Sequence, residues 1–231
     1  DDGPGAGPLN EPASQCGLDL EVRPGLRLTE AQYVASVRDL LGDPGYEAQL
    51  EEAPGLITQR AVRQLQDAAA AALARRGEWT TEVFPCDTAG PEDRACVEAF
   101  VAGFAARAFR RPLDDTERSR LLQTYDDARL ELAFGDAMEV LLRVILQSPA
   151  FVYLFEDGVA EATGAVRLLT DHEVAARLSY FLVGSTPDET LLAAADAGEL
   201  ATAEGLRAQA ERMLESPAAR RAATAFVSET M

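Results

Sequence analysis

The stretch 136–155, DAMEVLLRVILQSPAFVYLF, constrains the fold of this chain more than any other part of its sequence. Almost every side chain from Met138 to Leu146 is apolar, and the polar residues of the stretch fall on one helical edge. These edge residues are Asp136, Glu139, Arg143 and Gln147. A helix that is apolar almost all round lies inside a bundle, where other helices cover it. Pro149 ends the run before the roughly 18 apolar residues that a membrane span needs, so we predict a central core helix at 136–148.

The composition of the chain favours packed helices. Of the 231 residues, 47% are hydrophobic but only 6% are aromatic, which indicates a core of alanine, leucine and valine. No segment alternates convincingly between apolar and polar residues over the length of a strand. We therefore predict an all-α fold, a bundle of about eight to nine helices without a significant sheet. The helices near residues 97, 121 and 174 are expected to cover the central one.

Four stretches carry signals for the start of a helix. Three of them combine a leucine before the cap with a Thr or Asp cap and a Gln or Glu three residues later, which is a hydrophobic staple around a capping box. They begin at Leu28, Leu113 and Leu169. In the fourth, Thr186-Pro187-Asp188-Glu189, we expect Thr186 to be the N-cap and Pro187 to be the first helical residue.

The chain divides into a tail and a helical region. Residues 1–26 are acidic and rich in Gly and Pro at their start, which is typical of a tether or N-terminal extension; a tail without a role is the alternative. Residues 27–231 are long for one all-helical domain and short for two independent ones. We expect one compact unit there, with the subregions 27–76, 79–156 and 166–231. A flexible, acidic loop is expected between the last two subregions.

The formal net charge of −18 excludes most nucleic-acid binding, because phosphate contacts need a basic surface. The same charge disfavours docking on anionic lipid. Its simplest interpretation is a well-solvated surface, with weak surface binding of Ca²⁺ as a minor alternative.

Three cysteines raise the question of the compartment. Cys86 and Cys96 are ten residues apart, one in a loop and one at the start of a helix, which favours a local disulfide bond. Two reduced cysteines in a cytosolic protein are the alternative. A zinc site is not indicated, because the chain has no closely spaced cysteine pair and a single histidine. Cys16 is then unpaired, or pairs with a group outside this chain.

A few residues carry weak signals for acid–base chemistry. His172, the only histidine, lies in the first turn of an expected helix, where a solvent-facing position explains it better than the role of a general base. Four acidic residues of first helical turns could converge as the carboxylate pair of a glycosidase, although the helix dipole accounts for their positions. They are Asp171, Glu173, Asp188 and Glu189.

Three arginines stand close together in the segment FAARAFRRPL. Arg107, Arg110 and Arg111 could form an anion site, because a guanidinium group pairs well with carboxylate or phosphate. We favour a structural interpretation, in which arginines of a last helical turn stabilise the helix dipole and pair with the nearby Asp114 and Asp115.

Four stretches form a recognisable set. Two of them are LRLTEAQYVASVRDLLGD at 26–43 and the spaced cysteine pair followed by FAARAFRRPL at 86–113. The two more specific ones are LLRVILQSPAFVYLFE at 141–156 and LTDHEVAARLSYFLVGSTPDETLLAAADAGEL at 169–200. In sequence and spacing they resemble large exported proteins of unknown function from planctomycetes and myxobacteria. In those proteins several helical domains occur together, often beside c-type cytochrome domains.

The resemblance implies an exported protein, in the periplasm or on the outer surface, and a lipid anchor upstream of residue 1 is compatible with it. Proteins of this kind continue well past the position of Met231, so the resemblance covers only their N-terminal half. The chain has no C-x-x-C-H motif and therefore offers no site for covalently attached haem. No catalytic residues are established for these proteins, and none is carried over.

We therefore expect a non-enzymatic helical scaffold or interaction module of an exported cell-surface or periplasmic protein. The alternative is the helical half of an envelope enzyme, redox, cytochrome-linked or carbohydrate-active, whose reactive centre lies outside this chain. We expect no cofactor, no bound metal and no catalytic residue in the chain itself. The expected partners are the missing C-terminal half and cytochrome-type or other envelope proteins.

Overall fold

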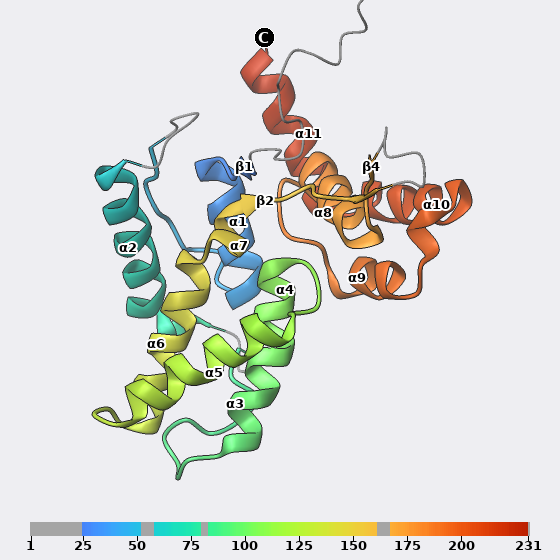
Figure 1. The fold of residues 1–231 in the computed structure, drawn as a ribbon. Coiled ribbons are helices and arrows are strands. Elements are labelled where there is room, and N and C mark those ends of the chain that lie inside the picture. Colours follow the sequence, from blue (N-terminus) through green and yellow to red (C-terminus); the bar gives the residue numbers. More distant parts are fainter. Residues whose placement is uncertain (1–24, 52–57, 80–82, 161–166, 231) are drawn as a thin grey trace, which may run out of the picture.

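The fold is all-α, as the sequence predicts (Figure 1). The computed structural model describes residues 25–51, 58–79, 83–160 and 167–230. A π-helical turn, Val101–Ala105, joins α3 and α4 into one continuous run. With that run counted once and the single-turn α7 set aside, nine helices remain in the described ranges, within the predicted number. The α-helices are α1 (Glu30–Leu41), α2 (Gln59–Ala74), α3 (Arg94–Phe100), α4 (Ala106–Phe109), α5 (Asp115–Arg129), α6 (Phe134–Gln147), α7 (Pro149–Val152), α8 (Asp171–Leu182), α9 (Glu189–Asp196), α10 (Ala203–Leu214) and α11 (Pro217–Thr230).

Two short antiparallel ladders accompany the helices. β1 (Leu26–Arg27) pairs with β2 (Tyr153–Leu154), and β3 (Val159–Ala160) pairs with β4 (Arg167–Leu168). Part of the acidic loop predicted after residue 156 is thus a strand. The backbone N–H and C=O groups of Val159 and Ala160 find their partners in β4. Two 3-10 turns lie at Arg76–Glu78 and Glu199–Ala201.

The three predicted capping boxes are confirmed. In each, the cap side chain accepts from the backbone N–H three residues later, and the side chain of that later residue accepts from the cap backbone. The pairs are Thr29 with Gln32 before α1, Asp114 with Glu117 before α5, and Thr170 with Glu173 before α8.

The predicted start of α9 is wrong by two residues. Asp188 is the N-cap, and its carboxylate accepts from the backbone N–H of Leu191 at 2.8 Å. The hydroxyl of Thr186 instead donates to the backbone carbonyl of Arg107 at 3.1 Å. Thr and Asp are both favourable N-cap residues. Because the hydroxyl of Thr186 is engaged with the carbonyl of Arg107, Asp188 caps the helix instead.

Helix α6 forms the centre of the larger of two hydrophobic clusters, which confirms the predicted core helix. It packs mainly against α5 and α2. The hydroxyl of Tyr33 in α1 donates to the carbonyl of Leu146 near its end, at 3.2 Å. None of the described helices combines the length and the apolarity that crossing a bilayer requires. The α6 side chains without exposed surface are Ala137, Met138, Leu141, Leu142, Ile145 and Leu146.

Helix α8 packs elsewhere than predicted. Its apolar side lies against α9 and α10 in a second, smaller cluster, to which Ala175, Leu191, Leu200 and Met213 belong. Figure 1 shows α8, α9 and α10 grouped together beside the helices α1 to α7. The helices that follow α8 closely in the sequence offer it an apolar surface, so α8 does not need α6 for its burial. Tyr180 of α8 nevertheless belongs to the larger cluster.

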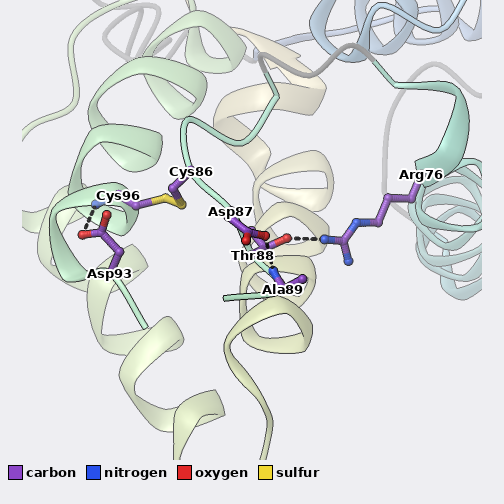
Figure 2. The surroundings of a disulfide bond; sticks show 7 residues. All are labelled: Arg76, Cys86, Asp87, Thr88, Ala89, Asp93 and Cys96. Carbon is purple, nitrogen blue, oxygen red and sulfur yellow. Dashed lines mark hydrogen bonds between the residues drawn. A yellow bond between two sulfur atoms is a disulfide. The ribbon is translucent and has the colours of Figure 1, made fainter. Parts of the chain in front are cut away.

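A disulfide bond joins Cys86 to Cys96 at the start of α3 (Figure 2). The two Cα atoms are 5.8 Å apart, within the usual range for such a bond. The structure thus brings together the pair that the spacing predicts. Asp93, the N-cap of α3, accepts from the backbone N–H of Cys96, and Arg76 donates to Thr88 of the same loop (Figure 2). Cys16 and nearly all of the predicted tether lie outside the described residues.

Replacing Ile145 by alanine should lower the free energy of unfolding by about 2–5 kcal/mol, as for a large residue in a packed core. Ile145 has no exposed surface, whereas its neighbour Val144 keeps 38% of its exposure and serves as the control. Val144→Ala should change the free energy by roughly 0.5 kcal/mol or less. Urea unfolding followed by circular dichroism measures both variants. An effect of Ile145→Ala no larger than that of the control would show that α6 is not the centre of the core.

Denatured, unreduced protein should react with a chromogenic thiol reagent at one of its three cysteines. Replacing Cys86 and Cys96 together by serine should lower the free energy of unfolding by roughly 2.5–3 kcal/mol, the loop-closure value for a loop of this size. Cys16→Ser is the matched control and should leave stability unchanged in the oxidised protein. Three reactive thiols before reduction would refute the bond.

Candidate functional site

The structure brings four of the eight candidate residues to one cleft. The cleft has a volume of about 270 Å³ and lies between α7 with β2 on one side and the start of α8 on the other. Arg110 and Arg111 line it from the turn after α4, and His172 and Glu173 line it from the first turn of α8. We call it the α7–α8 cleft. The other four candidates do not line it.

Arg110 is the most deeply buried charged residue of the cleft, with 4% of its surface exposed. Its guanidinium group donates to three backbone carbonyls in and after α7, those of Ala150 at 2.6 Å, Tyr153 at 2.8 Å and Phe151 at 3.1 Å. A short helix leaves its last carbonyls without intrahelical donors, and the arginine supplies those donors from another part of the chain. The prediction that Arg110 stabilises its own helix is therefore wrong, since it binds the end of α7.

The backbone of Arg110 adopts the left-handed conformation, with φ of 63°. Glycine is the usual residue at such a helix end, because a side chain in this conformation costs roughly 1–2 kcal/mol. Burial lowers the pKa of Arg110 below its ordinary value, and the neighbouring Tyr180 partly offsets this effect. Both the left-handed backbone and the burial of the charge are unfavourable, so the hydrogen bonds to the carbonyls must outweigh these two costs.

Tyr180 of α8 connects Arg110 to α1. Its hydroxyl accepts from a guanidinium nitrogen of Arg110 at 3.3 Å and lies 2.8 Å from the hydroxyl of Ser36. The guanidinium carbon also lies 5.7 Å from the centre of the Tyr180 ring, within the range of cation–π attraction. We call this the Arg110 network. Sequence reasoning missed Tyr180 and Ser36, because each is an unremarkable member of a helix face and no local pattern marks it.

Glu173 contributes one of the two carboxylates that line the cleft, beside Asp157, and hydrogen bonds engage both oxygens of Glu173. The backbone N–H of Gly158 donates to Oε1 at 2.9 Å, and the backbone N–H and hydroxyl of Thr170 donate to Oε2 at 2.6 and 2.9 Å. Burial raises the pKa of Glu173, but these hydrogen bonds outweigh it, so the pKa lies below its ordinary value. An ionised carboxylate with both oxygens engaged ties β3 to α8 and is a poor general acid.

His172 is not the solvent-facing residue that the sequence predicts. Its side chain keeps 21% of its exposure, and Nε2 lies 2.9 Å from a carboxylate oxygen of Asp196 at the end of α9. The packing of α8 against α9 brings the two side chains together across 24 positions of sequence. A general base is commonly oriented by such a carboxylate, so this pair is the feature of the cleft that most favours acid–base chemistry.

The three candidate arginines do not form a common anion site. Arg110 binds the end of α7, and Arg111 forms a two-pronged ion pair with Glu117 at 2.7 and 2.8 Å. Arg107 lies apart from both, near the start of α9. Glu117 takes the place of the acidic partners predicted at positions 114 and 115, because the side chain of Asp114 is engaged as the N-cap of α5.

The acidic candidates do not converge either. The carboxylate of Asp188 caps α9 and pairs with Arg212 at 2.8 and 2.9 Å, away from the α7–α8 cleft. The carboxylate of Asp171 accepts from the backbone N–H of Leu200 at 3.1 Å. Within the described ranges, no three His, Cys, Asp or Glu side chains lie close enough together to hold a metal ion.

The fold and the cleft define an all-helical chain in which two hydrophobic clusters meet at a buried arginine. Comparison with known families divides the chain in a similar way. Residues 96–156 match PSD5, a protein of unknown function (DUF1595), and residues 169–231 match PSD4, a protein of unknown function (DUF1592). No curated protein and no solved structure matches the chain. The contact between Arg110 and Tyr180 therefore joins the two matched segments.

Replacing Arg110 by methionine should lower the free energy of unfolding by about 2–4 kcal/mol, because three carbonyls lose a charged donor while the burial of the charge is relieved. Arg111→Met is the control, since that arginine forms an exposed ion pair and its loss should change stability by about 1 kcal/mol at most. Arg110→Gly separates the two roles of the residue, because glycine fits the left-handed backbone but makes no side-chain contact. Denaturant unfolding measures all three variants. A glycine variant more stable than the wild type would mean that the carbonyl contacts contribute nothing.

Replacing Glu173 by glutamine should reduce the loss of stability in acid. A carboxyl group whose pKa is lowered by folding contributes stability that is fully present above its ordinary pKa of 4.5 and lost as the pH falls through the folded value. The wild type should therefore be more stable than Glu173→Gln at pH 7, and the difference should shrink towards about pH 3. Glu204→Gln, in the exposed first turn of α10, is the control. A difference that stays constant with pH would show that the charge of Glu173 does not matter.

Proposed function

We propose that this chain is a non-enzymatic helical interaction module of an exported protein of the cell envelope. One observation supports the proposal most directly: three of the charged side chains that line the α7–α8 cleft are engaged in holding the fold. Arg110 binds backbone carbonyls, Arg111 binds Glu117, and Glu173 accepts hydrogen bonds at both oxygens. Groups that act on a substrate need free donors, acceptors or protons, and these three residues offer few.

Two further features support export. A disulfide bond between Cys86 and Cys96 is at home in an oxidising compartment, such as the periplasm or the cell surface. The four stretches quoted above also resemble exported proteins in sequence and spacing. A lipid anchor upstream of residue 1 would then hold the module at the membrane.

The charge of the chain defines the partner that we propose. With a net charge of −18, its surface attracts basic proteins and repels acidic ones over roughly a Debye length, which is about 8 Å at physiological ionic strength. A cytochrome-type envelope protein with a basic face is the partner that best combines this charge with the resemblance. The contact would be formed quickly and weakened by salt.

Binding between the purified chain and a basic cytochrome-type protein of the same envelope tests the proposal. Interferometry should give a dissociation constant in the micromolar range at about 50 mM salt, and the affinity should fall at least about tenfold at about 500 mM. His172→Ala and Glu173→Gln should leave the affinity unchanged, since neither residue is proposed to touch the partner. The absence of binding at low salt, or binding that salt does not weaken, would contradict an acidic interaction module.

The enzymatic alternative rests on the pair of His172 and Asp196. If the pair acts as a general base in a longer envelope enzyme, His172→Ala should abolish turnover by that enzyme while the fold stays intact. Asp196→Asn should lower turnover as well, because it removes the group that orients the imidazole. Full turnover by both variants would exclude the pair from the chemistry and favour the interaction module.

A further inference from the structure

A second cleft, distinct from the α7–α8 cleft, contains an arginine with one buried nitrogen that has no hydrogen-bond acceptor among the described residues. It has a volume of about 320 Å³ and lies where the end of α1, the loop before Cys86, the π-helical turn and the start of α9 meet. We call it the π-turn cleft. Its lining includes Asp39, Leu40, Val83, Gly103, Arg107 and Glu189.

Arg107 has a buried donor without an acceptor. Its Nε is buried and has no hydrogen-bond partner among the described residues. The nearest carboxylate oxygen, on Glu189, lies 3.7 Å from Nη1, which is beyond hydrogen-bonding distance, and the Glu189 side chain is 80% exposed. Arg110 and Arg111 have strong acceptors a few residues away, so the unpaired Nε of Arg107 and its long ion pair with Glu189 distinguish this arginine from them. A guanidinium group is well suited to binding a carboxylate with two parallel hydrogen bonds.

Two carboxylates, those of Asp39 and Glu189, line the π-turn cleft together with Arg107. Asp39 is held by the hydroxyl of Ser185, which donates to one carboxylate oxygen at 2.5 Å, and Glu189 lines the same cleft. Two carboxylates and one guanidinium give the cleft a formal charge of −1, and the chain as a whole carries −18. A simple anion would therefore be repelled. A ligand that carries an ammonium group together with its carboxylate matches both signs.

The π-helical turn leaves room for an apolar group. π-helical turns occur often at functional sites, and this one places Gly103 on the cleft. A β-carbon at Gly103 would meet no atom within 4 Å, so neither packing nor backbone geometry requires glycine there. Glycine inside a helix is unfavourable relative to alanine. The space it leaves open lies beside the apolar walls formed by Leu40, Val83 and Phe104.

We propose that the π-turn cleft binds a free α-amino acid with an apolar side chain. Arg107 would receive the carboxylate, Asp39 and Glu189 the ammonium group, and the space beside Gly103 the side chain. This site is independent of the interaction module proposed above, and the two can fail separately. The disulfide bond contributes to the site as well, because it fastens to α3 the loop that supplies Val83.

Isothermal titration calorimetry of the oxidised full chain with leucine tests the proposal. Leucine should bind with a dissociation constant below about 1 mM. N-acetyl-leucine lacks the ammonium group and leucine amide lacks the carboxylate, so each should bind at least about tenfold more weakly. Arg107→Met should weaken leucine binding to the same extent, whereas Arg118→Met, on the exposed surface of α5, should bind as the wild type does.

Gly103→Leu provides a second variant that does not touch the charged groups. Its side chain would fill the space assigned to the ligand while improving helix propensity, so melting temperature should be kept or raised and leucine binding lost. No binding of leucine, valine or phenylalanine up to about 10 mM would overturn the proposal. So would equal binding of leucine and leucine amide, or wild-type binding by a folded Arg107→Met or Gly103→Leu protein.

Discussion

The buried guanidinium of Arg110 is the contact on which the arrangement of this chain depends. Removing an arginine from water without a counter-charge is unfavourable, and it is tolerated only when strong hydrogen bonds replace the solvent. Carbonyl oxygens of Ala150, Phe151 and Tyr153 provide that replacement from one side, and the hydroxyl of Tyr180 provides it from another. The residue therefore joins the end of α7 to α8.

Around this contact, polar side chains also join the helices of the two hydrophobic clusters. Ser36 contacts Tyr180, Ser185 donates to Asp39, and Arg177 pairs with Glu156 at 2.6 Å. Such contacts specify an orientation, since each requires a defined distance and direction. Apolar contacts, which carry no direction, hold each cluster together from within. Apolar contacts therefore stabilise each cluster, and the polar contacts fix the orientation of one cluster relative to the other.

The parts of the fold that the sequence predicts correctly are those governed by neighbouring residues. Capping boxes span four residues, and the apolar face of α6 repeats within one helix, so both can be recognised locally. The Arg110 network spans 40 to 144 positions, and most of its acceptors are backbone carbonyls, which no side chain reveals. The contact between His172 and Asp196 is hidden for the same reason. The prediction that α8 packs against α6 is wrong, because the apolar face of a helix does not reveal which other helix will cover it.

The two clefts differ in how fully their polar groups are used. In the α7–α8 cleft the arginines and Glu173 have hydrogen-bond partners within the protein itself. In the π-turn cleft a guanidinium nitrogen is left without an acceptor, and a glycine leaves space that packing does not demand. Unsatisfied polar groups are uncommon in folded proteins. They are therefore a better guide to a ligand than the number of charged residues in a cleft.

The sequence separations within the Arg110 network also bear on the order in which the chain acquires its structure. The carbonyls that bind Arg110 follow it by 40 to 43 positions, inside the segment 96–156. Tyr180 follows Arg110 by 70 positions and lies outside that segment. Closing the shorter loop loses less chain entropy than closing the longer one. Because the chain emerges N-terminus first into the compartment in which it folds, the arginine can settle onto α7 before α8 is available. The second segment then arrives at a partner that is already in position, and its docking needs little rearrangement of the first.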